Sequence, residues 1–342
     1  MKKVKFGIFA DLHVDIMHDT EARLAEFIEA ARRADVDFII QLGDFCYPDE
    51  GRRCICQPEK RPENIENALN HPTYADKEAI RGMYMNFEKP AYHVIGNHDC
   101  DMCSKRMILD YYGAKYEPYY SFDVGDFHFI VLDPNYYLKD GEYISYEYGN
   151  YFDESYHKVP VLPYLPPKQI EWLKNELDST DKPSIIFTHQ SLRQNANGGI
   201  LNPQDFAEAI KGRRSRVLVA FNGHAHLDGA KKQDGTWYVH INSMSNYWMG
   251  EPHTCMGRFG AEIDEKYPNI RYVAPYTNSV YAIIELDENG AKINGTVGEF
   301  VGKTPDELHF YEKYGSCLIR RNEPLVSPSI EDRYLEFAES AG

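Results

Sequence analysis

The sequence predicts an α/β fold with largely parallel strands in its first half, and three observations support this prediction. Short apolar runs recur along the chain, and a glycine or a polar residue follows each of them, as expected of buried strands. Amphipathic helical segments stand between some of these runs, and strands that alternate with helices are typical of parallel sheets. The hydrophobic fraction of 43% over 342 residues is enough to fill a sizeable core.

The first 45 residues are predicted to form a strand, a helix and a second strand. Apolar residues alternate over 4–9, which is the period of a strand. Asp19 or Thr20 can cap a helix whose apolar side chains repeat at helical spacing. These side chains are Leu24, Phe27, Ile28 and Ala31. Residues 36–42 then form an apolar run that Gly43 ends, which indicates a buried strand.

The middle of the chain repeats this pattern, and the tail does not. Further strands are predicted at Ala91–Ile95, Phe127–Leu132, Ser184–Thr188 and Arg216–Phe221. Apolar residues at helical spacing predict a helix over 168–177. The tail instead has consecutive strand-like segments, and residues 287–290 have the composition of a hairpin turn between the last two. These segments are Trp237–Ile241, Ser279–Leu286 and Ala291–Phe300.

The charge and the hydropathy of the chain narrow the classes of function. Lys and Arg number 37 against 53 Asp and Glu, and the net charge of −16 repels a nucleic-acid backbone. No apolar run approaches the roughly 20 residues of a membrane span, and no secretory signal is recognisable at the start. We therefore expect a cytoplasmic protein with a small-molecule substrate; the oligomeric state is left open.

The seven cysteines do not suggest a disulfide framework, because their number is odd and the chain is long. Cys54, Cys56, Cys100 and Cys103 could supply four thiolates to a zinc ion. The alternative is a set of reduced, partly buried thiols. Both interpretations stay open at the level of the sequence.

Polar residues with metal-binding side chains follow five of the predicted strands. They are Asp11 and His13, then Asp44, then Asn97 and His98, then His189, and finally His224 and His226. Because ligands bind at the carboxyl ends of strands in α/β sheets, we expect these side chains to converge. Carboxylates and imidazoles together suit two divalent cations such as Mn²⁺, Fe²⁺/Fe³⁺ or Zn²⁺.

The ligands divide naturally between two cations. Asp11, His13 and His226 would complete one site, Asn97, His189 and His224 would complete the other, and the two oxygens of Asp44 would bridge them. Two ions about 3.5–4 Å apart can share a hydroxide that attacks phosphorus while they clamp the phosphoryl group. The pattern therefore predicts a dinuclear centre that activates water.

The ordered motifs resemble those of the calcineurin-like metallophosphoesterase superfamily over residues 4 to about 241. The motifs are Asp11-x-His13, Gly43-Asp44, Gly96-Asn97-His98-Asp99, His189 and Gly223-His224-x-His226. The resemblance implies a four-layer αββα sandwich of two mixed β-sheets flanked by helices, with a dinuclear metal site at the strand ends. It also implies that His98 stabilises the transition state or protonates the leaving oxygen. Asp99 either orients His98 or is a turn residue.

One departure from the family pattern bears on the substrate. Many relatives carry a second acidic residue three positions after the aspartate of the Gly-Asp motif, where this chain has Tyr47. The departure disfavours a close match to the protein Ser/Thr phosphatases. The remaining motifs look more like those of bacterial phosphodiesterases that act on cyclic nucleotides, glycerophosphodiesters and nucleoside diphosphate derivatives.

These observations predict a metal-dependent hydrolase that cleaves a small phosphodiester or a pyrophosphate by a metal-bridging hydroxide. One alternative is a DNA nuclease of the double-strand-break-repair type, which shares the motif series but needs a basic track for the strand. The other is a catalytically inert metal-binding scaffold. Because every ligand position and His98 are filled, the scaffold has less support.

The specificity residues are expected outside the metal motifs. Asn242 and His253 are candidates to contact phosphate oxygens, Asp133 to border the site, and Trp248 to stack on the organic part of the substrate. We expect residues 1–300 to form the catalytic domain and 301–342 to be an extension that packs on it. The insert 136–165, with eight tyrosines over 136–164, is interpreted either as a substrate lid or as a packed surface segment.

Overall fold

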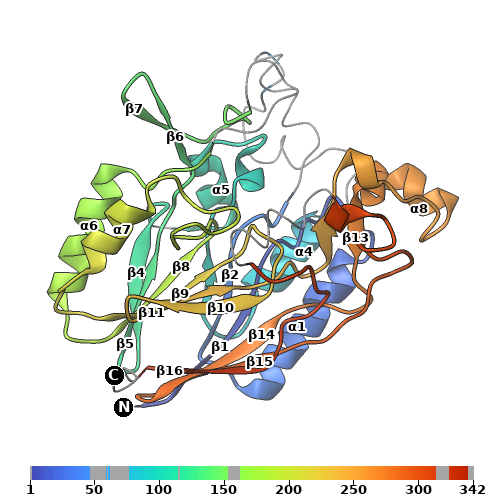
Figure 1. Ribbon diagram of the computed structural model, residues 1–342. Helices are drawn as coiled ribbons and strands as arrows, with labels where there is room; N and C mark the ends of the chain where they lie inside the picture. The colour runs from blue at the N-terminus through green and yellow to red at the C-terminus, as the bar shows by residue number, and fades with distance from the viewer. Residues whose placement is uncertain are drawn as a thin grey trace.

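The computed structural model describes residues 2–46, 59, 61, 77–114, 116–152, 162–312 and 323–337. Two six-stranded mixed sheets dominate these residues (Figure 1). In order across the first sheet, the strands are β16 (Arg333–Glu336), β15 (Gly290–Gly295), β14 (Ala282–Leu286), β1 (Val4–Phe9), β2 (Phe38–Gln41) and β3 (Ala91–His93). In the second sheet they are β10 (Gly229–Gln233), β11 (Thr236–His240), β9 (Val217–Asn222), β8 (Ser184–Thr188), β5 (Phe127–Val131) and β4 (Tyr120–Val124).

Helices and two small two-stranded sheets complete the described fold. The helices are α1 (Thr20–Ala34), α4 (Lys77–Met85), α5 (Lys105–Tyr111), α6 (Pro167–Ser179), α7 (Pro203–Ile210) and α8 (Ala261–Lys266), with short 3₁₀ segments η2 (His98–Cys100), η3 (Glu251–His253) and η4 (Pro268–Tyr272). One sheet is the hairpin of β6 (Tyr136–Lys139) and β7 (Glu142–Ser145), and the other pairs β12 (Asn246–Trp248) antiparallel with β13 (Val273–Pro275). No helix among the described residues is long and apolar enough to cross a membrane.

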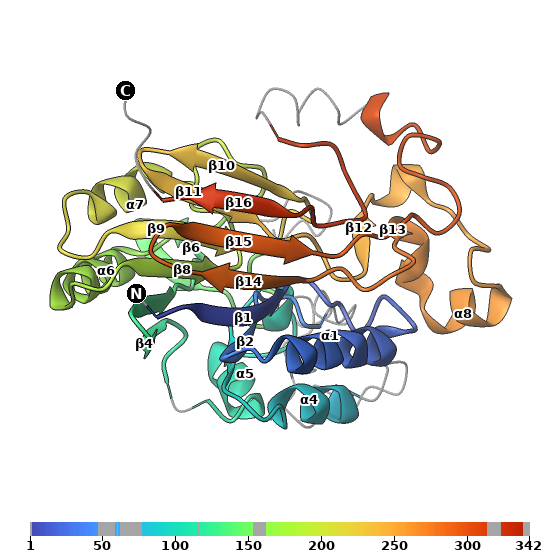
Figure 2. The same ribbon diagram turned by 90° about the horizontal axis from the view of Figure 1, so that it is seen from below.

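The strands that lead to the predicted site residues are parallel within each sheet. In the first sheet β1, β2 and β3 are parallel, whereas β14, β15 and β16 pair antiparallel with their neighbours (Figure 2). In the second sheet β5, β8, β9 and β11 are parallel. The carboxyl ends of neighbouring parallel strands therefore lie at one edge of each sheet, and loops that leave these ends are neighbours in space.

The two sheets pack face to face through aromatic side chains. Phe6 of β1 and Phe38 of β2 contact phenylalanine rings of the second sheet at centroid distances of 5.1–6.0 Å. The partner rings are Phe129, Phe187 and Phe221, and all five side chains are fully buried. Fully burying one such ring stabilises the fold by about 1.5–3 kcal/mol. This shared core fixes one sheet against the other.

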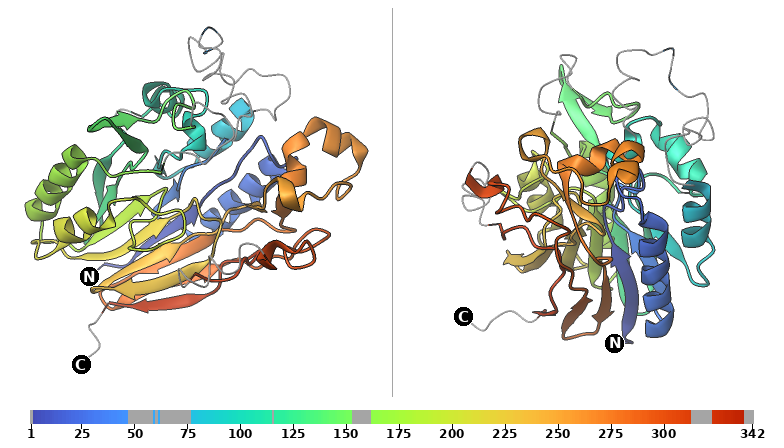
Figure 3. Two further views of the ribbon diagram at one scale, coloured as in Figure 1. Left: turned by 45° about the horizontal axis from the view of Figure 1, so that its top comes forward. Right: turned by 90° about the vertical axis from the view of Figure 1, so that its right-hand side faces the viewer.

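Helices cover the outer face of each sheet. The apolar sides of α1 and α4 pack on β1 and β2, and those of α6 and α7 pack on β5, β8 and β9 (Figure 3). At Gly7 of β1 an added Cβ would lie 3.0 Å from the ring of Phe27, so the glycine allows α1 to approach closely. The predicted four-layer αββα sandwich is confirmed.

The differences from the sequence prediction concern short and polar elements. The predicted strand over 291–300 ends at Gly295, where the backbone lies so close to Ile330 that an added Cβ would be 2.0 Å from its carbonyl oxygen. Residues 136–152 form the β6–β7 hairpin and a turn that buries Tyr146 and Tyr151 against η2 and α5. The turn of the tyrosine-rich insert is therefore packed on the molecule, whereas the end of the β6–β7 hairpin is exposed. Residues 153–161 of the insert lie outside the described part of the chain.

Candidate metal centre

Six of the predicted ligand residues form two compact groups at the strand ends. The first group contains Asp11, His13 and His226, and the second contains Asp44, His189 and His224. Within each group, one ligand atom from every residue lies within 4.8 Å of the others. The first group joins loops that follow β1 and β9, and the second joins loops that follow β2, β8 and β9. The centre thus lies between the two sheets and depends on the fold of both.

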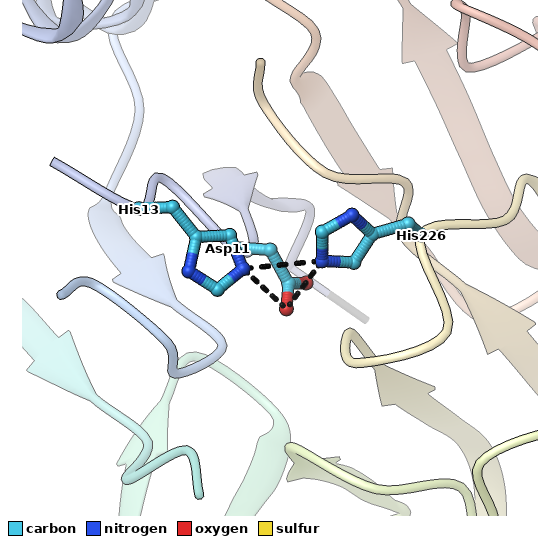
Figure 4. Close-up of side chains that lie close together, drawn as sticks. All are labelled: Asp11, His13 and His226. Carbon is cyan, nitrogen blue, oxygen red and sulfur yellow. Dashed lines mark hydrogen bonds and ion pairs between the residues drawn. The ribbon is translucent and has the colours of Figure 1, made fainter. Parts of the chain in front are cut away.

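The first group presents one carboxylate to two imidazoles (Figure 4). The Nε2 atoms of His13 and His226 lie 3.2 Å apart, and they lie 3.8 and 3.3 Å from Oδ1 of Asp11. This carboxylate oxygen is buried without a well-formed hydrogen bond from any described residue. A buried carboxylate oxygen that faces two imidazole nitrogens fits a bound cation, because such a group is costly to bury unsatisfied.

In the second group, three possible ligand atoms surround Nε2 of His189. This nitrogen lies 3.1 Å from Oδ2 of Asp44, 3.2 Å from Nδ1 of His224 and 3.1 Å from Oδ1 of Asn97. The amide oxygen of Asn97, the seventh predicted ligand, therefore points into this group. Oxygen and imidazole nitrogen donors at such spacing suit a divalent transition metal.

Two of the histidines are oriented by backbone carbonyls outside the groups. Nδ1 of His189 lies 2.8 Å from the carbonyl oxygen of Leu42, and Nδ1 of His226 lies 2.7 Å from that of Asn246. Because Nδ1 donates to a carbonyl, the lone pair is on Nε2, which faces the centre. This arrangement is typical of histidines that bind metals.

The loops that carry the groups adopt an unfavourable backbone conformation. Five of the six residues have a positive φ, which side chains other than glycine rarely tolerate. The values are 52° for Asp11, 49° for His13, 52° for Asp44, 63° for His224 and 49° for His226. Each such residue costs about 1–3 kcal/mol and persists only when the surrounding structure imposes it. Gly96 helps to impose the position of Asp44, because its backbone lies so close that an added Cβ would be 2.1 Å from Oδ1 of Asp44.

The electrostatics of the centre favour added positive charge. Burial lowers the pKa of His13 and of His224 to about 3, so both imidazoles are neutral and free to act as ligands. Burial alone would raise the pKa of Asp44, but the nearby imidazole of His189 outweighs it and holds that pKa well below its usual range. Burial alone would lower the pKa of His189, yet Asp44 raises it to about 9. The buried carboxylates therefore favour positive charge beside them, which a cation bound by the neutral imidazoles would supply.

His98 lies beside the first group and is held by two residues that the sequence did not single out. Its ring centroid is 5.8 Å from that of His13, and its backbone N–H donates to Oδ1 of Asp44 at 2.8 Å. Nδ1 of His98 lies 2.9 Å from Oδ2 of Asp101, and the hydroxyl of Tyr151 donates to the same carboxylate and lies 3.3 Å from Nδ1. Burial lowers the pKa of His98, but the carboxylate of Asp101 outweighs it and raises that pKa.

Asp99 stabilises a loop and does not contact the ring of His98. Its carboxylate accepts hydrogen bonds from the backbone N–H groups of Gly96, Asp44 and Phe45 at 2.8–3.0 Å. Of the two roles expected for Asp99, the structure shows the turn role. It thereby joins the loops after β2 and β3, which carry Asp44 and Asn97.

A pocket of about 320 Å³ opens beside both groups. Besides residues of the two groups, its lining includes Ile16, His98, Asn197, Gly198, Tyr247 and Trp248. Trp248, a predicted substrate residue, is therefore at the pocket. None of the described lining residues is a lysine or an arginine.

The other three predicted substrate residues have internal contacts and do not line this pocket. The buried amide of Asn242 donates to two backbone carbonyls of the segment 323–337. The ring of His253 lies 2.9 Å from a backbone carbonyl, and Asp133 forms a buried ion pair with Lys105 at 2.5 Å. These contacts stabilise the loops around the centre.

The cysteines among the described residues do not form a group of three or more possible metal ligands. Cys100 and Cys103 are buried in an apolar cluster, and burial raises the pKa of the Cys100 thiol well above its ordinary value. Cys54 and Cys56 lie outside the described residues. The four-thiolate zinc site stays a prediction.

Comparison with known proteins places the chain in a family. Residues 4–228 match the family of calcineurin-like phosphoesterases. The chain belongs to this family, which confirms the resemblance. Membership implies metal-dependent hydrolysis of a phosphoester, and the two groups described above are the candidate ligands of the divalent cations.

Solved structures with the same fold come from distant relatives. A dimetal phosphatase from Danio rerio has 16% sequence identity and a TM-score of 0.57, covering 88% of this chain and 99% of that one. GAP50, the anchor in the inner membrane complex of Plasmodium, has 14% identity and a TM-score of 0.50, covering 96% of each chain. At these identities the similarity shows the fold alone. No curated protein matches the sequence.

Proposed function

We propose that this phosphoesterase holds two divalent cations, Mn²⁺, Fe²⁺/Fe³⁺ or Zn²⁺, and cleaves a small phosphodiester or a pyrophosphate. The observation that carries the proposal is the pairing of two three-residue donor groups between the sheets. The two groups are neighbours, because the backbone N–H of His224 in the second donates to Oδ2 of Asp11 in the first at 2.9 Å. Mixed carboxylate and imidazole donors suit these borderline metals.

Each group would hold one cation. Asp11, His13 and His226 would bind the first, and Asn97, His189 and His224 would bind the second, with Asp44 between them. Two cations in one site supply a Lewis acid for the phosphoryl oxygens and a lowered pKa for bound water. The positive φ values and the oriented imidazoles mean that the chain holds its ligands in place before any substrate arrives.

His98 is the proposed proton donor to the leaving oxygen. Asp101 engages Nδ1, so the proton for the substrate would come from Nε2 on the other side of the ring. The residue also lines the pocket, where a leaving group would be within reach. Asp101 and Tyr151 are positioning residues, because they fix the imidazole and do not themselves line the pocket.

The size and lining of the pocket support a small substrate. A volume of about 320 Å³ is at the lower end of ligand pockets in proteins. Tyr247 and Trp248 offer aromatic surface to the organic part of a phosphoester. One pocket thus offers both candidate metal ligands for the phosphoryl group and aromatic surface for the organic group.

The two alternatives are weaker. A nuclease would need a basic track for the DNA strand, and the described pocket lining contains no lysine or arginine. The net charge of −16 is also unfavourable for binding a DNA strand. The inert scaffold is favoured only by the similarity of the fold to GAP50, which is described as an anchor. A complete donor set with a fixed His98 favours catalysis over a purely structural role.

The decisive experiment combines metal titration with a substrate panel. Metal-free protein is titrated with Mn²⁺, and hydrolysis of bis(p-nitrophenyl) phosphate, p-nitrophenyl phosphate, cyclic nucleotides, glycerophosphodiesters and nucleoside diphosphate derivatives is followed. We expect two bound ions per chain, with activity that requires both. Two bound ions without hydrolysis of any compound would leave the scaffold as the function, and salt-sensitive cleavage of DNA would support the nuclease.

A further inference from the structure

We propose that Glu323 is a positioning residue of the active site, through which the segment 323–337 fixes one wall of the substrate pocket. The inference rests on the proposed function, since the pocket in question is that of the candidate metal centre. The segment ends in β16, which pairs with β15 at the edge of the first sheet. The side chain of Glu323 instead points into the molecule and is 1% exposed.

One oxygen of Glu323 holds the loop between β8 and α7. Oε1 accepts the backbone N–H of Asn197 at 2.9 Å and forms an ion pair with the guanidinium of Arg193. The side chain of Arg193 is 8% exposed, so the pair is buried. Asn197 and the next residue, Gly198, line the pocket. The carboxylate therefore fixes the backbone of the pocket wall directly.

The other oxygen of Glu323 is connected to the loop that carries His224 through His240 and Asn222. Oε2 lies 3.4 Å from Nε2 of His240, and Nδ1 of the same ring lies 2.9 Å from Nδ2 of Asn222. Since the amide nitrogen of Asn222 is a donor, Nδ1 is the acceptor and Nε2 carries the proton that faces Glu323. Asn222 is the last residue of β9 and also donates to the carbonyl of Gly223 at 2.8 Å. One carboxylate thus links two loops of the centre.

The wall that Glu323 holds is in direct contact with a candidate metal ligand. Gly198 has a φ of 61°, and a Cβ added to it would lie 2.6 Å from Cδ2 of His224. The backbone of the loop therefore rests on the imidazole of the second group. If the loop moved outward, the pocket would widen and His224 would lose this support.

The buried carboxylate of Glu323 is stable only if its neighbours compensate for its charge. A buried carboxylate is costly unless it is paired and hydrogen-bonded. Glu323 meets this condition through Oε1, which Arg193 and the N–H of Asn197 engage, whereas Oε2 has only the 3.4 Å approach of His240. Loss of the charge would leave a buried guanidinium without its partner, so the loop would relax toward solvent.

The test compares Glu323→Gln with a matched control in the same segment. Arg333→Gln removes the ion pair of Arg333 with Asp228, which also joins the segment to the rest of the chain and does not contact the described pocket lining. Both variants are assayed with bis(p-nitrophenyl) phosphate at saturating Mn²⁺. We expect Glu323→Gln to raise KM about tenfold and to change kcat by less than about threefold, and Arg333→Gln to change neither.

Hydrogen exchange provides a measurement that does not depend on activity. In Glu323→Gln, a peptide that spans 191–201 should exchange faster than in the wild type, and in Arg333→Gln it should not. Arg193→Lys keeps the buried charge and should shift KM in the same direction by less, so it replaces Glu323→Gln if that variant does not fold. An unchanged KM with unchanged exchange, or equal changes in the control, would overturn the proposal. Absence of hydrolysis by the wild type would refute the proposed function. The hydrogen-exchange data would still show whether Glu323 fixes the pocket wall.

Discussion

Asp101 lies three residues after His98 and places Oδ2 2.9 Å from its Nδ1, so the ring that faces the pocket is fixed by its own 3₁₀ turn. The hydroxyl of Tyr151 donates to the same carboxylate from the tyrosine-rich insert. Tyr151 is 50 residues away from Asp101 in the chain. The aromatic residues of the insert therefore contribute to the geometry of the proposed proton donor.

Replacement of His98 should separate chemistry from metal binding. In His98→Ala the backbone N–H that donates to Asp44 is retained, so the second group keeps its geometry. We expect kcat to fall by about 10²–10⁴-fold, which is the usual contribution of a general acid. Metal content, measured by plasma mass spectrometry, should stay at the wild-type value. A variant that loses its metals would show that His98 supports the centre and does not act as a proton donor.

Removal of the Tyr151 hydroxyl should have a smaller effect on the same step. Tyr151→Phe keeps the ring, which stacks on Tyr146 at a centroid distance of 4.5 Å, and removes the donor to Asp101. We expect kcat to fall by about three- to tenfold, because the net value of one such hydrogen bond is about 0.5–1.5 kcal/mol. KM and metal content should be unchanged. Tyr143→Phe, on the exposed hairpin, is the matched control and should have wild-type kinetics.

Replacement of Asp44 should remove metal and activity together. In Asp44→Asn the oxygen that lies 3.1 Å from Nε2 of His189 loses its charge or is replaced by a donor. We expect the bound metal to fall below one ion per chain and hydrolysis to fall to the background. Reloading with Mn²⁺ should raise the melting temperature of the wild type and not that of the variant, because a ligand stabilises the state that binds it. Two ions retained in the variant would refute the bridging role.

The sequence predicted the strand ends well because each strand is an apolar run that stops at a glycine or a polar residue. Ser184–Thr188 is a strand with the predicted bounds, and the six grouped residues follow such runs. The strands that were not predicted are short or polar, such as β10 with the sequence GAKKQ at a sheet edge. An edge strand buries little apolar surface, so its sequence shows no strand period.

The partners of the site residues could be predicted less well. Asp101 is close to His98 in the chain, and an acidic residue at this spacing in the Gly-Asn-His motif is a signal that could have been used. Tyr151 and Glu323 come from distant segments without any apolar period. Their roles depend on which loops the two sheets bring together, and that information lies in the tertiary contacts.

The acid stability of the fold should depend on His93, a buried residue of β3 that is not one of the candidate metal ligands. The ring is 3% exposed, stacks on Tyr112 at a centroid distance of 3.8 Å, and has no hydrogen bond from either nitrogen among the described residues. Burial lowers its pKa to about 3 in the folded protein, against about 6.5 in an unfolded chain. Between these two values the unfolded state binds more protons, so the free energy of unfolding falls as the pH falls below about 6.5.

His93→Phe keeps an aromatic ring against Tyr112 and removes this titration. Relative to its own value at pH 8, the wild type should lose about 2 kcal/mol more than the variant at pH 5, since one pKa unit corresponds to about 1.4 kcal/mol. Urea unfolding of the metal-free proteins at both pH values measures this difference, and the metal ligands contribute equally to both chains. His309→Gln, which changes an exposed histidine, should behave like the wild type. Parallel loss of stability in the wild type and in His93→Phe would mean that His93 is already protonated, or solvated, in the folded state.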